Sequence, residues 1–121
     1  METQISSQLS PCPLFRSHPD VFERFVTTYR EIVELAIQQA VSGTDRHVFG
    51  KLRLLARQAG QQDAVPQDMI AVHLTALSVI VKTKPQAMVR ASIRHSRLLL
   101  VKMIGELAIY YREQAIGPKA D

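Results

Sequence analysis

Apolar side chains recur along four stretches of this chain with the period of an α-helix, and a glycine or a proline follows each stretch. The stretch of residues 17–42 separates an apolar stripe from a charged face most cleanly. No stretch alternates with the period of two that marks a β-strand. The pattern therefore predicts an all-α fold, a four-helix bundle with short loops. The predicted helices cover residues 17–42, 44–59, 66–83 and 86–115.

Local signals indicate where these helices begin and end. Ser17 and Asp20 have the spacing of a capping box, and Pro19 suits the first turn of a helix. Thr44 is expected to cap the second helix, and Gly117-Pro118 is expected to terminate the fourth. The predicted organisation is a flexible amino-terminal arm over residues 1–16, the bundle domain over 17–116 and a tail over 117–121.

Two of the predicted helices are more apolar than a lone small domain requires. Between Met69 and Val81 the apolar positions cover about 220° of a helical wheel at roughly 100° per residue, and from Leu98 to Ile109 the apolar run is almost unbroken. A chain of 121 residues covers only part of that surface itself, so we expect a homodimer. The expected dimer interface contains Met69, Ile70, His73, Leu74, Leu77, Ile80, Leu100, Ile104 and Leu107.

Composition places the chain among ordinary globular proteins. A hydrophobic content of 46% and a charged content of 21% argue against disorder across the chain. The single cysteine, Cys12, excludes an intramolecular disulfide, and we interpret it as an inert exposed thiol. The amino terminus lacks the features of a secretory signal, and the longest apolar run, residues 98–101, is far too short to span a bilayer. We therefore expect a cytoplasmic protein that does not contact membranes.

No residue set specifies a reaction, so we expect no catalytic, cofactor-binding or metal-binding residues. His73 lies within the apolar arc of the third helix, and we interpret it as a buried histidine bonded to a neighbour. A pH-sensitive contact is the first alternative, and catalysis is the second. Glu31 and Glu34 are interpreted as part of a surface ion-pair face rather than an acid/base pair. No two of the four histidines have the four-residue spacing that places two metal ligands on one helix face.

A basic segment is the strongest candidate for contact with a partner. Arg90, Arg94 and Arg97 share one face of the fourth predicted helix, within a stretch of 21 residues that contains six cations and no acid. This face is interpreted as a solvated bundle edge or as a docking edge for an acidic protein segment. Nucleic acid is disfavoured, because no aromatic residue interleaves with the basic ones and no helix-turn-helix spacing is evident.

Three short segments of the chain resemble one family of helical domains. Residues 29–33 resemble the opening of the C-terminal domain of the circadian clock protein KaiA. Residues 65–73 resemble the start of that domain's middle helix and a similar pattern in the amino-terminal domain of the RsbU phosphatase. Residues 110–112 resemble the aromatic-arginine end of the last helix, and the resemblance covers about residues 20–115.

The resemblance implies a homodimeric four-helix bundle that binds a partner in a clock or stress-response switch. It also implies that the third and fourth helices build the dimer, and that His73 lies near functional surface. The predicted function is a non-enzymatic dimeric regulatory module that binds a kinase, a phosphatase or an anti-sigma-type regulator through a peptide or helix. The alternative is a nucleic-acid-binding helical protein that uses the basic face of the fourth helix. The expected partner-binding residues are Arg90, Arg94, Arg97, Tyr110, Tyr111 and Arg112.

Overall fold

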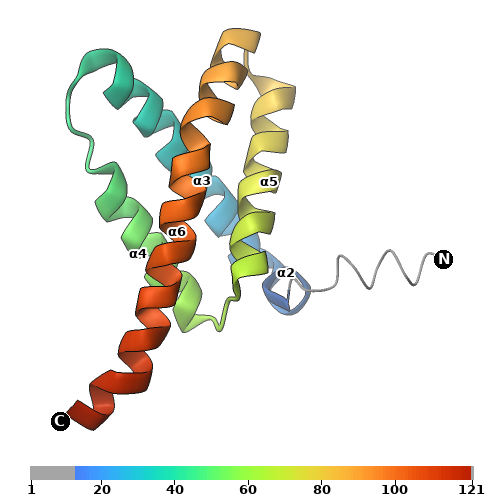
Figure 1. Ribbon diagram of the computed structural model, residues 1–121. Helices are drawn as coiled ribbons and strands as arrows, with labels where there is room; N and C mark the ends of the chain where they lie inside the picture. The colour runs from blue at the N-terminus through green and yellow to red at the C-terminus, as the bar shows by residue number, and fades with distance from the viewer. Residues whose placement is uncertain (1–12, 121) are drawn as a thin grey trace.

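Four long helices and one short helix make up residues 13–120, the part of the chain that the computed structural model describes (Figure 1). No strand occurs among these residues. The prediction of an all-α four-helix bundle is therefore confirmed for the described part of the chain. The helices are α2 (Pro13–Ser17), α3 (Pro19–Ser42), α4 (Val48–Gln61), α5 (Pro66–Thr83) and α6 (Gln86–Ala120).

The predicted bounds of α5 are those observed, whereas the start of α3 differs in detail. Pro19 is the first residue of α3, but the N-cap is His18 and no side chain caps the helix. The predicted capping box of Ser17 and Asp20 is therefore wrong. The carboxyl end of α3 follows the prediction, since Gly43 adopts a left-handed conformation with φ 75° and its N–H donates to the Gln39 carbonyl at 2.8 Å.

Two other helix ends differ from the prediction. Thr44 does not cap α4, which begins only at Val48. The Asp45 carboxylate instead accepts a hydrogen bond from the His47 N–H at 2.8 Å, which holds the connecting loop in a tight turn. The expected stop at residues 117–118 is also wrong, because α6 continues to Ala120.

The segment just before α3 is folded rather than part of an arm. Leu14 in α2 is 2% exposed and belongs to the hydrophobic core. Its N–H donates to the Asp68 carboxylate, Oδ1, at 3.2 Å, which ties α2 to the first turn of α5. The bundle therefore includes residues 13–16, which were expected in the arm. The remainder of that expected arm, with Cys12, lies outside the described residues.

Helix α6 crosses the front of the bundle and packs against α3, α4 and α5 (Figure 1). This position explains part of its long apolar run, because three neighbours each need a matching side. Among the described residues, no helix combines the length and the apolar character that crossing a bilayer would require. The largest fully buried hydrophobic side chains are Tyr29, Leu14, Ile32, Leu52, Leu55, Met69, Ile80, Met103, Leu107, Val33 and Val72.

Candidate functional site

One side of α5 leaves apolar side chains in contact with solvent. Ile70, Leu74, Leu77 and Val81 are spaced four, three and four residues apart, which is the spacing of a coiled-coil seam. Leu74 is 58% exposed, Val81 is 55% exposed and Ile70 is 39% exposed. Leu77 packs partly against the core. We call these four residues the α5 seam.

The outer side of α6 mixes arginines with exposed apolar side chains. Leu98 and Val101 are 62% and 67% exposed, and Ile93 is 39% exposed. The three arginines predicted from the sequence are also exposed. We call this set the α6 face; its members are Arg90, Ile93, Arg94, Arg97, Leu98 and Val101.

A buried tyrosine shows how the α5 seam lies relative to α6. The Tyr29 hydroxyl lies 2.7 Å from His73 Nδ1 on α5 and donates to the Ser96 carbonyl on α6 at 3.3 Å. His73 therefore lies where α3, α5 and α6 meet. Ile70 and Leu77 lie three residues before and four residues after His73, so they share its side of the helix. The α5 seam thus borders the α6 face along the packed pair of helices.

The α6 face is strongly positive. No acidic residue occurs in the chain between Asp68 and Glu106. Two cations of this stretch reach a carboxylate from the edge of the face: Lys84 lies 3.8 Å from Glu34, and Lys102 lies 3.3 Å from Glu106. Within residues 13–120, the three arginines of the α6 face form no ion pair.

The core uses four of the nine residues expected in the dimer interface. Met69, Ile80 and Leu107 are each 1% exposed, and His73 is 7% exposed, so each side chain is covered within one copy. Their assignment to an intersubunit surface is therefore corrected. The apolar arc predicted for α5 divides into a core-facing side and an outward side. Met69, His73 and Ile80 lie on the core-facing side of α5, and Leu107 lies on the core-facing side of α6. Of the others, Ile70 and Leu74 are exposed, and Leu77, Leu100 and Ile104 are half-buried.

The tyrosine pair near the end of α6 has a packing role. The Tyr110 ring packs against Gly60 of α4 so closely that a Cβ at Gly60 would collide with it. The Tyr111 hydroxyl donates to the Ala64 carbonyl at 2.5 Å, and burial together with the nearby Asp63 carboxylate raises the pKa of this tyrosine. Both side chains therefore join α6 to the end of α4 and the loop after it.

The structure does not bring that tyrosine pair together with the arginines of the α6 face. Tyr110 follows Arg97 by thirteen positions on one continuous helix, which separates them by about 20 Å along its axis. Arg112 is exposed beyond them. The six residues expected to bind a partner therefore form two separate groups, of which only the group on the α6 face borders the α5 seam.

The sequence analysis did not predict two buried carboxylates. Asp68 is 0% exposed, and besides the Leu14 N–H it accepts the Val65 N–H through Oδ2 at 2.7 Å. Its place at the third position of a helix that begins at Pro66 was a signal that could have found it. The Leu14 contact, 54 residues away in the sequence, had no local signal.

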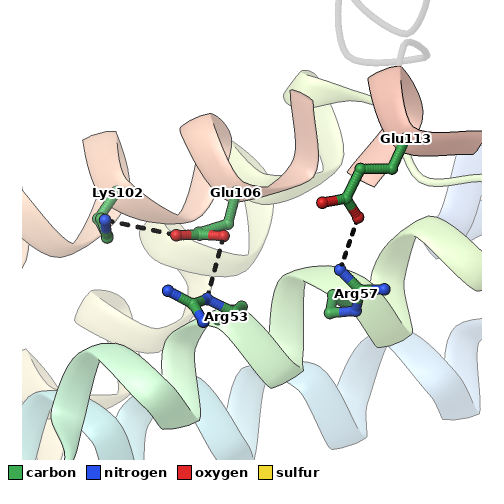
Figure 2. A network of polar contacts seen from close by, with 5 residues as sticks. All are labelled: Arg53, Arg57, Lys102, Glu106 and Glu113. Atoms are coloured by element: carbon green, nitrogen blue, oxygen red, sulfur yellow. Dashed lines mark hydrogen bonds and ion pairs between the residues drawn. The ribbon is translucent and has the colours of Figure 1, made fainter. Parts of the chain in front are cut away.

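The second buried carboxylate belongs to a charged network between α4 and α6 (Figure 2). Glu106 is 6% exposed and lies 3.5 Å from Arg53 Nε and 3.3 Å from Lys102 Nζ. One turn further along α4 and two turns further along α6, Arg57 pairs with Glu113 at 3.0 Å. Only the Lys102–Glu106 pair was detectable in the sequence, because its members lie four residues apart on one helix.

The interpretation of His73 as a buried histidine bonded to a neighbour is confirmed by its contact with Tyr29. The Tyr29 hydroxyl thus bridges His73 Nδ1 at 2.7 Å and the Ser96 carbonyl at 3.3 Å. Burial lowers the pKa of His73 and raises that of Tyr29, so both groups are neutral near pH 7. This chain of two hydrogen bonds links α3, α5 and α6.

Two surface grooves offer no built ligand site. The larger, about 810 Å³, runs between α3 and α5, and its charged lining mixes acids with arginines. The smaller, about 460 Å³, lies beside the loop that contains His47. Ser92 Oγ, the one buried polar side-chain atom without a partner among the described residues, lines neither groove. No three metal-ligating side chains in the described part of the chain are placed to hold an ion.

Comparisons with models of known protein families, with curated proteins and with solved structures found no match to this chain. The class defined by the fold is thus that of an all-helical four-helix bundle. The resemblance of its sequence to the KaiA and RsbU helical domains stays a prediction.

Proposed function

We propose that this protein is a non-enzymatic, dimeric regulatory module that binds a signalling protein and changes that protein's activity. One observation carries the proposal: the α5 seam presents apolar side chains to solvent with the spacing that helices use to pair. An exposed apolar stripe beside a charged rim is typical of a protein interaction surface. The occupant assigned to the seam is a second copy of the chain.

Energetics support a paired state. Fully burying one leucine or isoleucine side chain contributes roughly 1.5–3 kcal/mol, and association costs roughly 4–15 kcal/mol. A two-fold interface uses the same patch twice, so each exposed residue of the seam contributes two side chains. The half-buried Leu100 and Ile104 on the neighbouring side of α6 extend the apolar area.

The buried polar groups support binding rather than catalysis as the role of this surface. Asp68 satisfies two backbone N–H groups, Glu106 pairs two cations, and His73 forms a hydrogen bond with Tyr29. Each group is thus accounted for by a structural contact inside the bundle. The α5 seam and the α6 face, by contrast, expose apolar side chains to solvent, and such side chains are available for association.

A partner in a clock or stress-response switch, and a cytoplasmic location, are carried into this proposal from the sequence. The four-helix bundle is compatible with the resemblance that suggests them. A paired module of this kind would present two equivalent α6 faces to its target. Binding would then favour one activity state of the target over another.

The oligomeric state and its dependence on the seam test the proposal. Light scattering during size-exclusion chromatography is expected to give the wild-type chain a mass of twice 13.6 kDa. Leu74→Glu places a charge in the seam and is expected to give the 13.6 kDa monomer. Val41→Glu is the matched control, because Val41 is 83% exposed near the end of α3, and it should leave the dimer intact.

Circular dichroism of the three proteins checks that the bundle is folded, which is expected because Leu74 and Val41 are both exposed. A wild-type chain that remains monomeric at high concentration would overturn the paired state. A folded Leu74→Glu protein that dimerises as well as the wild type would place the interface elsewhere and remove the seam from the proposal.

A further inference from the structure

We infer that the α6 face binds an acidic amphipathic helix of a partner protein. The arginines of the face pair with carboxylates of that helix, and Leu98 and Val101 pack on its apolar side chains. This assignment rests on the proposed function, whose partner it specifies chemically. It concerns a surface distinct from the α5 seam, so each can fail without the other.

The spacing of the arginines matches that of side chains on another helix. Arg90, Arg94 and Arg97 lie four and three residues apart, so they form a row about 10 Å long over two turns of α6. Carboxylates at the same spacing on a partner helix form a row of the same length. Each guanidinium presents paired N–H donors that fit a carboxylate in a bidentate geometry.

The charge of the face specifies an anionic partner. The arginine row has no ion pair within residues 13–120, and the sequence from residue 69 to residue 105 supplies no acid to neutralise it. Like charges on one helix face repel each other at a spacing of four residues. A row of carboxylates brought against the arginines relieves that repulsion and adds attraction.

The apolar members of the face favour a protein over a nucleic acid. Leu98 and Val101 are each more than 60% exposed and lie beside the arginines on the same helix. An amphipathic helix buries such side chains, whereas a sugar-phosphate backbone does not. Nucleic-acid surfaces also use aromatic side chains for stacking, and residues 86–109 contain no Phe, Tyr or Trp.

The acids in the groove between α3 and α5 of a second copy do not match the arginine row. The outer surface of α3 carries Asp20 and Glu23, but Arg24 and Arg30 line the same groove. Docking that groove on the α6 face would place its arginines against the arginines of the face. The complement of the α6 face is therefore a helix with acids and apolar residues segregated onto adjoining strips, on another protein.

Fluorescence anisotropy with a defined peptide tests the inference on the full chain. The probe is a fluorescein-labelled, helix-forming peptide that carries glutamates four and three residues apart, with leucines on the adjoining strip. A peptide of the same composition in scrambled order is the first control. The α6 face is altered in R94E/R97E and, more conservatively, in R94Q/R97Q. The matched charge control is R16E/R24E, because both of its arginines are exposed on α2 and α3.

The wild-type chain is expected to bind the patterned peptide at least about tenfold more tightly than either altered face does. The R16E/R24E protein should bind within about twofold of the wild type, and the scrambled peptide should bind at least about fivefold more weakly than the patterned one. Raising the salt concentration should weaken binding. Circular dichroism is expected to show every variant folded, since all the altered side chains are exposed.

Three results would overturn the inference. The first is that the patterned peptide does not bind the wild-type chain at low salt. The second is that it binds R94Q/R97Q as tightly as the wild type. The third is that a DNA oligonucleotide binds more tightly than the peptide and loses affinity in R94E/R97E. The last result would assign the face to nucleic acid. A dimer that ignores the peptide refutes this inference alone, whereas a monomer that binds it refutes the paired state alone.

Discussion

Removing the Asp68 carboxylate should loosen both α2 and the start of α5. The buried carboxylate accepts the Leu14 N–H at 3.2 Å and the Val65 N–H at 2.7 Å. Asp68→Ala deprives both donors of their acceptor. It also removes a negative charge from the first turn of a helix, where the helix dipole favours it.

The magnitude follows from the surroundings of the two donors. A hydrogen bond to a charged group contributes about 1.5–3 kcal/mol, and a buried donor left unpaired loses about 1–3 kcal/mol. Leu14 is buried, so its N–H suffers the larger loss, whereas Val65 is half-buried and its N–H regains some hydration. We expect Asp68→Ala to lower the free energy of unfolding by about 3 kcal/mol. Asp68→Asn keeps one acceptor oxygen and should lose roughly half of that.

Urea denaturation measures the change in stability, and amide hydrogen exchange at Leu14 measures the release of α2. The control is Glu31→Ala, which removes an exposed carboxylate from α3 and should change stability by less than about 0.5 kcal/mol. An Asp68→Ala protein within that margin of the wild type would refute the reasoning. So would unchanged protection of the Leu14 amide, because the hydrogen bond would then not hold α2 in place.

Two further predictions concern packing and pH. Gly60→Ala should destabilise the protein by about 1–2 kcal/mol, because the new Cβ collides with the Tyr110 ring. Gly50→Ala in the same helix is the control, since its Cβ meets nothing within 4 Å and the substitution should stabilise the protein slightly. Equal effects of the two substitutions in thermal melts would contradict this prediction. Burial lowers the pKa of His73 below its unfolded value of 6.5, so the unfolded chain binds the extra proton and stability should fall as the pH drops below 6.5. The pH profile of His73→Gln should be flatter between pH 7 and 5, and a profile parallel to that of the wild type would contradict the assignment.

The sequence predicted the helices best where proline and glycine set their ends. Pro66 opens α5, and α5 stops just before Lys84-Pro85, so both bounds followed from backbone geometry. The predicted start of α4 was wrong because two neighbouring residues gave competing local signals. Thr44 has a side chain that could cap a helix, but the Asp45 carboxylate forms the turn that is observed. Local signals that compete within a few residues are resolved only by the folded loop.

The candidate site was predicted in part. The exposed arginines and the apolar excess of α5 followed from composition and spacing, because charge and helical period are local properties. Which apolar side chains lie outside did not follow. Ile80 is buried and Leu74 is exposed, although both lie in one apolar arc of one helix. That distinction depends on where α3 and α6 pack, and no single helix encodes the position of its neighbours.

The hydroxyl of Tyr29 has a consequence for how the surface above it meets a ligand. It forms hydrogen bonds from α3 to both α5 and α6, so α5 and α6 cannot slide past each other without breaking a buried hydrogen bond. The platform is therefore rigid before any encounter, and most of the entropy lost on complex formation is lost by the incoming molecule. A partner segment that is structured before binding should consequently bind far more tightly than a disordered segment with the same side chains.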